Sequence, residues 1–240
     1  MIELVATPIG HLEDLSPRAK AAFEAADVVA CEDTRRTGRL MQAVGVKVKL
    51  VAYHEHNERK MAETLVRWAK EGQRIVVVSD GGTPSVSDPG FSLMREAIAE
   101  GVAVSMIPGP VAFVMAAVLS GLPVHGITFR GFPPKKSGPR KRFLEVDVAS
   151  PHTLVIYESP YRVTKLIADA IEVLGDRPAA LARELTKLHE EVIRGRLSEI
   201  ATEVERRGGQ VPGEICLVIA GAGVDQGWFD DENAPNLDDE

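Results

Sequence analysis

The residues best suited to chemistry in this sequence follow short apolar runs, where glycine, proline and polar side chains gather. The clearest case is the stretch 75–90, IVVVSDGGTPSVSDPG. Its first four residues are apolar and β-branched, as in a buried strand, and the residues after them are turn formers. Two glycines at a strand end let a ligand lie against bare backbone, and open α/β sheets bind ligands at such strand ends. The stretch predicts a ligand-binding corner, with a tight connection that binds nothing as the alternative.

Similar corners end the other strand-like runs of the first half. TPIG (7–10) follows run 2–6, EDTRR (32–36) follows 27–31, YHEHN (53–57) follows 48–52, and PGP (108–110) follows 102–107. Helical patterns lie between them: one capped by Ser16, one that Gly45 ends, one over 58–70, and one over 91–100 with Asp88 as N-cap and Pro89 first. This alternation predicts a parallel sheet covered by helices. Neither G-x-G-x-x-G nor the P-loop pattern occurs.

A second α/β domain is predicted after Gly121-Leu122-Pro123. Strands are expected over 127–132, 152–157, 179–183 and 214–220, with an edge strand or hairpin at 192–195. Ser159 with Pro160, and Ser198, are expected to start helices. The predicted organisation is an N-terminal domain with a parallel sheet (1–121), a C-terminal domain with a mixed sheet (122–223), and an acidic, disordered tail (224–240).

Composition leaves most function classes open. The chain has 240 residues and net charge −7, but seven acidic groups lie from Asp225 onward, so the rest balances at 28 basic and 28 acidic residues. A nucleic-acid partner is therefore not excluded. Cys31 and Cys216 lie in apolar runs, as expected of buried, reduced thiols in a cytosolic protein. The N-terminus does not read as a signal peptide, and the uncharged stretch 102–124 is broken by PGP, so we expect no membrane span.

The segment 133–142, PPKKSGPRKR, carries five positive charges and no apolar side chain outside its prolines. It is expected to lie in solvent. It is either a solvated loop or a phosphate-contacting patch for nucleic acid, and the sequence leaves both open.

Several motifs in one order carry a resemblance to a known family. They are TPIG with LED (7–14), EDTR (32–35), SD with GTP (79–84), SDPG (87–90), PGP (108–110), SGLP (120–123), YESP (157–160) and RELTK (183–187). Together they resemble the ribosomal RNA small-subunit methyltransferase I family, which belongs to the tetrapyrrole-methylase-like class (class III) of S-adenosylmethionine enzymes. The chain departs from that family's pattern at His11, where Asn is usual, at Gly81, where Ala is usual, and at Val111, where Ser is common.

The resemblance implies two α/β domains with S-adenosylmethionine folded in a cleft between them. It implies 2′-O-methylation of a cytidine in the decoding region of 16S ribosomal RNA, within the small ribosomal subunit, by a cytoplasmic homodimer. Carried over by position, the residues expected to contact the cofactor are Ile9, Asp80, Thr83, Val111, Ala112, Tyr157 and Gly213.

Methyl transfer to a ribose hydroxyl needs an aligned nucleophile and a proton acceptor. The acceptor candidates are Asp33, Glu158, Glu184 and His54, and Lys187 is a further catalytic candidate. Basic residues that could bind RNA phosphates, or lower the pKa of the hydroxyl, are Arg35, Lys135, Lys136, Arg140, Lys141, Arg142 and Arg183. For each of these side chains, a structural ion pair at a strand end is the competing interpretation.

Two rival functions remain at this point. A methylase of a tetrapyrrole or another small molecule predicts a broad apolar pocket and no role for residues 135–142. A non-enzymatic nucleotide-binding module on the same sheet predicts ligand binding without turnover.

Overall fold

The computed structural model describes residues 1–224, so the predicted acidic, disordered tail (224–240) lies almost wholly outside the described residues. Its contacts divide the chain into two compact units, Met1–Val111 and a second that begins at Ala112. The sequence placed this boundary later, after Gly121. The difference arises because the helix that starts at Ala112 packs on strands of the second sheet, which no local pattern reveals.

The first unit is a parallel sheet with the strand order β3-β2-β4-β1-β5. Its strands are β1 (Ile2–Val5), β2 (Val28–Cys31), β3 (Lys49–Ala52), β4 (Ile75–Val77) and β5 (Val104–Ile107). Its helices are α1 (Pro17–Ala25), α2 (Thr34–Ala43), α3 (Glu58–Lys70) and α4 (Phe91–Ala99), with a short 3₁₀ helix at Leu12–Asp14.

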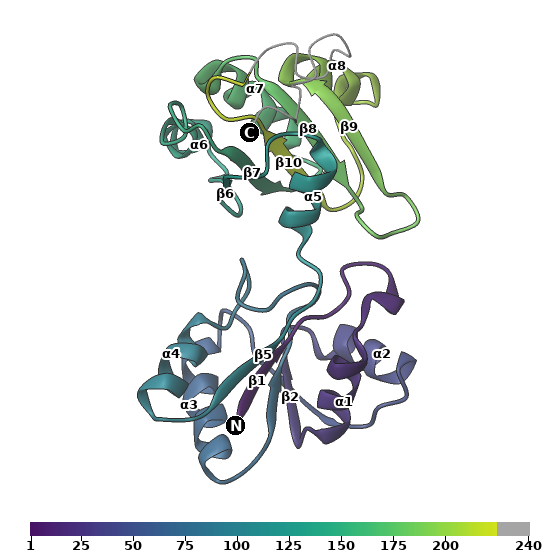
Figure 1. Ribbon diagram of the computed structural model, residues 1–240, viewed down its shortest axis with the longest axis vertical. Helices are drawn as coiled ribbons and strands as arrows, with labels where there is room; N and C mark the ends of the chain where they lie inside the picture. The colour runs from purple at the N-terminus through teal and green to yellow at the C-terminus, as the bar shows by residue number, and fades with distance from the viewer. Residues whose placement is uncertain (225–240) are drawn as a thin grey trace. The chain divides into compact units, whose positions relative to one another are not determined.

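Alternation along the strands fills a core on each face of this sheet. Ile75 and Val77 pack with α3 and α4, whereas Val76 packs with α1 and α2 through residues such as Phe23. Figure 1 shows the same arrangement, with α3 and α4 on one side of the strands and α1 and α2 on the other. Because helices lie on both faces, the inner strands β2 and β4 are apolar and buried on both sides, as the sequence predicted.

The second unit is a mixed sheet with the order β6-β7-β10-β8-β9 (Figure 1). Its strands are β6 (Ile127–Phe129), β7 (Thr153–Glu158), β8 (Pro178–Arg183), β9 (Glu191–Arg196) and β10 (Ile215–Ile219). Only β6 and β7 run parallel among these neighbours; the expected hairpin of β8 and β9 is antiparallel and ends at an edge. The helices are α5 (Ala112–Ser120), α6 (Ser137–Glu145), α7 (Val163–Leu174) and α8 (Leu197–Arg206).

Two predicted helix N-caps are wrong. Helix α4 has Gly90 as its N-cap, with φ +146° and no side-chain cap bond, so Asp88 does not cap it. Helix α7 begins at Val163, because the carbonyl of Ser159 accepts from the N–H of Arg162 and of Val163 in a turn that precedes the helix. By contrast, Ser16 caps α1 as predicted, with its hydroxyl oxygen 3.0 Å from the N–H nitrogen of Ala19.

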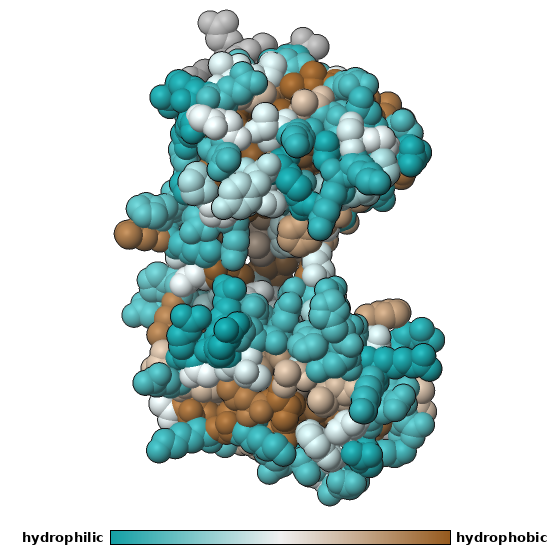
Figure 2. All heavy atoms as spheres, turned by 180° about the vertical axis from the view of Figure 1, so that it is seen from behind, coloured by the Kyte–Doolittle hydropathy of each residue, from teal (hydrophilic) through white to brown (hydrophobic). Residues whose placement is uncertain are grey.

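The described surface is mixed in polarity. Figure 2 shows mostly hydrophilic residues over the visible face of the second unit and a hydrophobic area on that of the first. Both cysteines are buried and unpaired. Within residues 1–224, no helix combines the length and apolar character that a bilayer crossing needs.

Candidate functional site

The loops that follow β1, β4 and β5 are joined at one edge of the first sheet. Thr7 and Gly82 exchange two backbone hydrogen bonds of 2.9 Å each. The Thr83 hydroxyl donates to the carbonyl of Pro110 over 3.3 Å. Because these strands are parallel neighbours, their carboxyl ends meet here, which is where α/β sheets bind ligands.

Four of the predicted cofactor residues lie on these joined loops: Ile9, Asp80, Thr83 and Val111. Ile9 is half-buried and packs on Gly82, where an added Cβ would lie 3.2 Å from its Cγ2. Gly109 is needed for the same packing, since a Cβ there would lie 2.7 Å from that of Ala6. The other predicted cofactor residues, Ala112, Tyr157 and Gly213, belong to the second unit.

Asp80 connects this corner to the start of α2. Its Oδ1 accepts from the backbone N–H of Asp33 over 3.1 Å, and its Oδ2 lies 3.8 Å from a guanidinium nitrogen of Arg36. The side chain remains 30% exposed. The helix dipole attracts a carboxylate to a helix N-terminus, so the start of α2 helps to hold the Asp80 side chain in place.

Two further carboxyl groups, those of Glu32 and Asp88, lie close enough to Asp80 for its negative charge to raise their pKa values. Burial, and then the charge of Glu32, raises the pKa of Asp88 to about 6. Burial, and then the charge of Asp80, raises the pKa of Glu32. Neither residue was predicted as a site residue; the signal that could have found them is their place in the strand-end motifs EDTRR and SDPG.

Asp33, a predicted proton acceptor, is the N-cap of α2 and is held by Arg35. The Nε and Nη2 of Arg35 donate to its two oxygens over 3.1 and 2.8 Å, and the backbone N–H of Arg35 donates over 2.8 Å. These hydrogen bonds hold the pKa of Asp33 well below its usual value. The Arg35 side chain is 87% exposed despite this pair, so it can also reach an anion.

Glu184, Lys187 and Gly213 come together in the second unit, where β8 ends and β10 begins. Glu184 Oε1 accepts from Lys187 Nζ over 2.9 Å and from the N–H of Glu214 over 2.8 Å. The hydrogen bond from Lys187 lowers the pKa of Glu184 against the effect of burial. Burial disfavours the charged Lys187, but its bonds to Glu184 and Glu214 prevail and raise its pKa.

Glu158 lies in the same unit, and its side chain is fully buried. Its Oε1 accepts from the N–H of Ser159 over 2.6 Å and lies 2.5 Å from the Arg162 guanidinium, whereas Oε2 has no hydrogen-bond partner among the described residues. The side chain therefore cannot meet a substrate without a rearrangement.

Some of the basic residues predicted to bind RNA are already bound by other groups of the protein, and the others are exposed. The guanidinium of Arg183 donates to the carbonyls of Pro212 and His189 and pairs with Glu191. Lys141 pairs with Glu172 at 2.6 Å. The remaining exposed cations of segment 133–142 are Lys135, Lys136 and Arg142.

Arg140 corrects the expectation that segment 133–142 lies in solvent. It is 2% exposed and its guanidinium binds Asp169 on α7 at 2.7 Å, which anchors helix α6. Arg140 Nη1 also donates to the carbonyl of Lys135 over 3.1 Å. Arg140 is thus an internal brace, because a buried cation is tolerated only with a partner.

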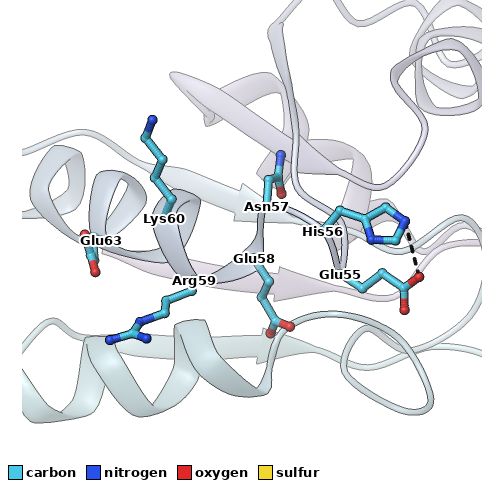
Figure 3. Close-up of a pocket in the computed structure, with 7 residues that line it drawn as sticks. All are labelled: Glu55, His56, Asn57, Glu58, Arg59, Lys60 and Glu63. Atoms are coloured by element: carbon cyan, nitrogen blue, oxygen red, sulfur yellow. Dashed lines mark ion pairs between the residues drawn. The ribbon is translucent and has the colours of Figure 1, made fainter.

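A hollow of about 300 Å³ opens beside the start of α3 (Figure 3). It is lined by seven polar residues, Glu55, His56, Asn57, Glu58, Arg59, Lys60 and Glu63. No predicted site residue lines it. The predicted candidate His54 lies next to it in sequence, half-buried, with an Nδ1 that has no partner among the described residues.

Comparison with known proteins identifies the chain's relatives. A family model described as tetrapyrrole (corrin/porphyrin) methylases matches residues 1–201. A protein named ribosomal RNA small subunit methyltransferase I from Halalkalibacterium halodurans is 44% identical over 92% of this chain and 75% of its own length. The protein of that name from Thermotoga maritima is 38% identical over 91% of this chain and 97% of its own length.

Solved structures support the fold. The methyltransferase CobJ aligns with a TM-score of 0.69 and 19% identity over 91% of this chain and 93% of its own. Uroporphyrin-III-C-methyltransferase from Thermus thermophilus aligns with a TM-score of 0.62 and 21% identity over 95% and 94% of the two chains. Together with the joined loops of the first sheet, these matches lead to one conclusion: the chain belongs to the tetrapyrrole (corrin/porphyrin) methylase family and, within it, to the ribosomal RNA small subunit methyltransferase I group.

Proposed function

We propose that this protein transfers the methyl group of S-adenosylmethionine to the 2′-hydroxyl of a cytidine ribose in the decoding region of 16S ribosomal RNA. The observation that carries this proposal is the 44% identity over 92% of the chain to a ribosomal RNA small subunit methyltransferase I. The motifs behind the resemblance include the three loops that hydrogen bonds join at the carboxyl edge of the first sheet.

The residues at that edge suit the methyl donor. S-adenosylmethionine has an ammonium group and ribose hydroxyls, which a part-exposed carboxylate such as Asp80 can bind. Ile9 and Val111 are half-buried and apolar, and can flank the adenine or the methionine chain. The donor supplies an electrophilic methyl carbon on a sulfonium. That Ala112, Tyr157 and Gly213 also contact it stays a prediction.

Among the predicted proton acceptors, we propose that Glu184 accepts the proton of the ribose hydroxyl. Its side chain is 19% exposed and that of Lys187 is 26% exposed, whereas Glu158 is sealed and Asp33 caps a helix. The ammonium of Lys187 favours a developing alkoxide, which helps a carboxylate of low pKa to accept the proton. Positioning supplies the larger share of the rate, as expected for an in-line displacement.

Lys135, Lys136, Arg142 and Arg35 are the exposed cations to which we assign phosphate contacts. These four side chains can neutralise phosphates independently of base sequence. We further propose that the RNA is bound within the small ribosomal subunit, in the cytoplasm, by a homodimer whose symmetry would widen the basic surface.

The proposal can be tested by incubating the protein with labelled S-adenosylmethionine and three acceptors at one stated salt concentration. The acceptors are small subunits that lack the modification, free 16S RNA and a porphyrinogen. We expect label in the subunits, recovered as 2′-O-methylcytidine after digestion and mass spectrometry. Label in the porphyrinogen would instead support a small-molecule methylase, and donor binding without transfer to any acceptor would support a binding module.

A further inference from the structure

Helix α4 follows the loop 79–90, which carries the predicted donor-binding residues Asp80 and Thr83, and its N-cap residue makes no side-chain cap bond. Its N-cap is Gly90, and the backbone N–H groups of Gly90 and Ser92 are bound by a residue of another helix. Oε1 of Glu58, in the first turn of α3, accepts from these two groups over 3.1 and 3.2 Å. The carboxylate therefore satisfies two of the N–H groups that every helix start leaves unpaired.

The same oxygen of Glu58 is fixed by a third donor. The hydroxyl of Tyr53, a residue that is only 1% exposed, donates to Oε1 over 3.1 Å. Figure 3 shows the Glu58 side chain directed away from Lys60 and toward the ribbon of the neighbouring segment. Burial opposes ionisation of Glu58, but these hydrogen bonds outweigh it and its pKa lies below the usual value.

Gly90 links the Glu58 carboxylate to the loop 79–90, which carries the predicted donor-binding residues Asp80 and Thr83. It directly follows Asp88 and Pro89, and it packs on Ser85 of the same loop so closely that an added Cβ would lie 1.9 Å from the Ser85 hydroxyl oxygen. Ser85 and Ser87 both have positive φ, 70° and 63°, a backbone conformation that must be held by its surroundings. The loop 79–90 is thus tied at its far end by Glu58.

We propose that Glu58 is a positioning residue for the methyl-donor site, because it holds the start of α4 and with it the loop 79–90 in the conformation that binds the donor. This role rests on the proposed function, since that loop carries Asp80 and Thr83. Glu58 does not itself touch the donor. The competing role is purely structural, in which Glu58 only stabilises the packing of α3 against α4.

Four variants of the full-length protein separate the two roles. Glu58→Ala removes the acceptor, Glu58→Gln keeps one carbonyl oxygen for the same N–H groups, and Glu63→Ala removes an exposed carboxylate of the same helix. Phe23→Leu lowers stability from the opposite face of the sheet. The measurements are the Kd of S-adenosylmethionine by calorimetry, Tm, and the KM and kcat of methyl transfer.

We expect Glu58→Ala to raise the Kd and the donor KM roughly tenfold, with a smaller change in kcat, because two N–H groups lose their acceptor. Glu58→Gln should restore the affinity to within about threefold, and Glu63→Ala should match the wild type. Phe23→Leu should lower Tm at least as much as Glu58→Ala and leave the Kd unchanged. Equal loss of affinity in Phe23→Leu and Glu58→Ala would overturn the proposal.

A measurement without donor keeps this inference separate from the proposed function. Amide hydrogen exchange of the free protein should be faster across residues 79–92 in Glu58→Ala, by roughly tenfold or more, and not in Phe23→Leu. Unchanged exchange there would refute the positioning role even if methyl transfer were confirmed. Faster exchange in a protein that binds no S-adenosylmethionine would refute the proposed function and, with it, Glu58 as a positioner of a donor site.

Discussion

The carboxyl groups at the edge of the first sheet differ in pKa because their surroundings differ. Asp33 has a guanidinium and a helix start as partners, so its pKa lies far below the usual value. Asp88 is partly withdrawn from water and has other carboxylates near it, so its pKa is raised to about 6. Two aspartates thus differ: Asp33 keeps its negative charge in mild acid, whereas Asp88 titrates near pH 6.

Replacing Asp88 should therefore change stability in a pH-dependent way. Its folded-state pKa of about 6 lies above the ordinary value of 3.8, so the charged form destabilises the fold fully above about pH 6, and this cost fades as the pH falls from about 6 to 3.8. We expect Asp88→Asn to raise Tm by about 2–4 °C at pH 8 and by about half as much at pH 5. Calorimetric scans at the two pH values check this, and a gain that is equal at both would contradict the charge argument.

Glu184 and Lys187 are predicted to act as a pair. Glu184→Gln keeps an oxygen for the N–H of Glu214 but removes the charge that accepts a proton, so kcat should fall by about 10² or more while Tm changes little. Lys187→Met should also lower kcat, since it removes the ammonium that favours the alkoxide. Single-turnover methyl transfer to small subunits measures both effects. Near-normal turnover of Glu184→Gln would remove Glu184 from the chemistry and leave it a structural role.

At the scale of elements, the end of β8 can pack against the start of β10 because residue 213 is a glycine. Gly213 has φ +108°, and a Cβ there would lie 2.3 Å from Cγ of Glu184, which itself has φ +49°. Gly213→Ala should thus displace the Glu184 carboxylate and strain the backbone, lowering kcat at least tenfold and stability by about 1–3 kcal/mol. Gly209→Ala is the matched control: it also has positive φ, +76°, but no atom within 4 Å of an added Cβ. If both variants lost activity equally, backbone strain alone would explain the loss.

Local patterns predicted most elements but not the contacts that end or anchor them. The range 58–70 of α3 was predicted as the structure has it, because its apolar spacing and the Gly72 after it are local signals. The cap of α4 was predicted wrongly because the acceptor of its first N–H groups is Glu58 on another helix. The burial of Arg140 was missed because its partner, Asp169, lies on α7.

The candidate site follows the same division. Ile9, Asp80, Thr83 and Val111 were named from the family resemblance, and the loops that carry them meet because parallel strands bring their carboxyl ends to one edge. Glu32 and Asp88 stand in strand-end motifs, but their raised pKa values depend on burial and mutual charge that only the folded chain produces. The roles of the predicted site residues remain predictions that the variants above address.

For the whole molecule, the distribution of charge matters more than its sum. The net charge is −7, and seven acidic groups lie from Asp225 onward, so residues 1–224 carry as many positive as negative charges. Many of those positive charges are already paired, as in Arg140 with Asp169 and Lys141 with Glu172. Binding of a polyanion should then depend mainly on exposed cations such as Lys135 and Lys136, which pair with no described carboxylate.

Removing these two lysines should weaken RNA binding in a salt-dependent manner. Each phosphate contact that is lost reduces the slope of log K against log salt by about 0.7–0.9, so Lys135→Ala with Lys136→Ala should reduce it by about 1.4–1.8. The measurement is a titration of small-subunit RNA at several salt concentrations. Lys141→Ala provides the control within the same helix segment: its ammonium is already bound by Glu172 at 2.6 Å, so its loss should change the slope much less. An equal change in the double variant and in Lys141→Ala would mean that RNA binding depends only on the total charge of segment 133–142. The ion pairs with Asp169 and Glu172 would then have no effect on RNA binding.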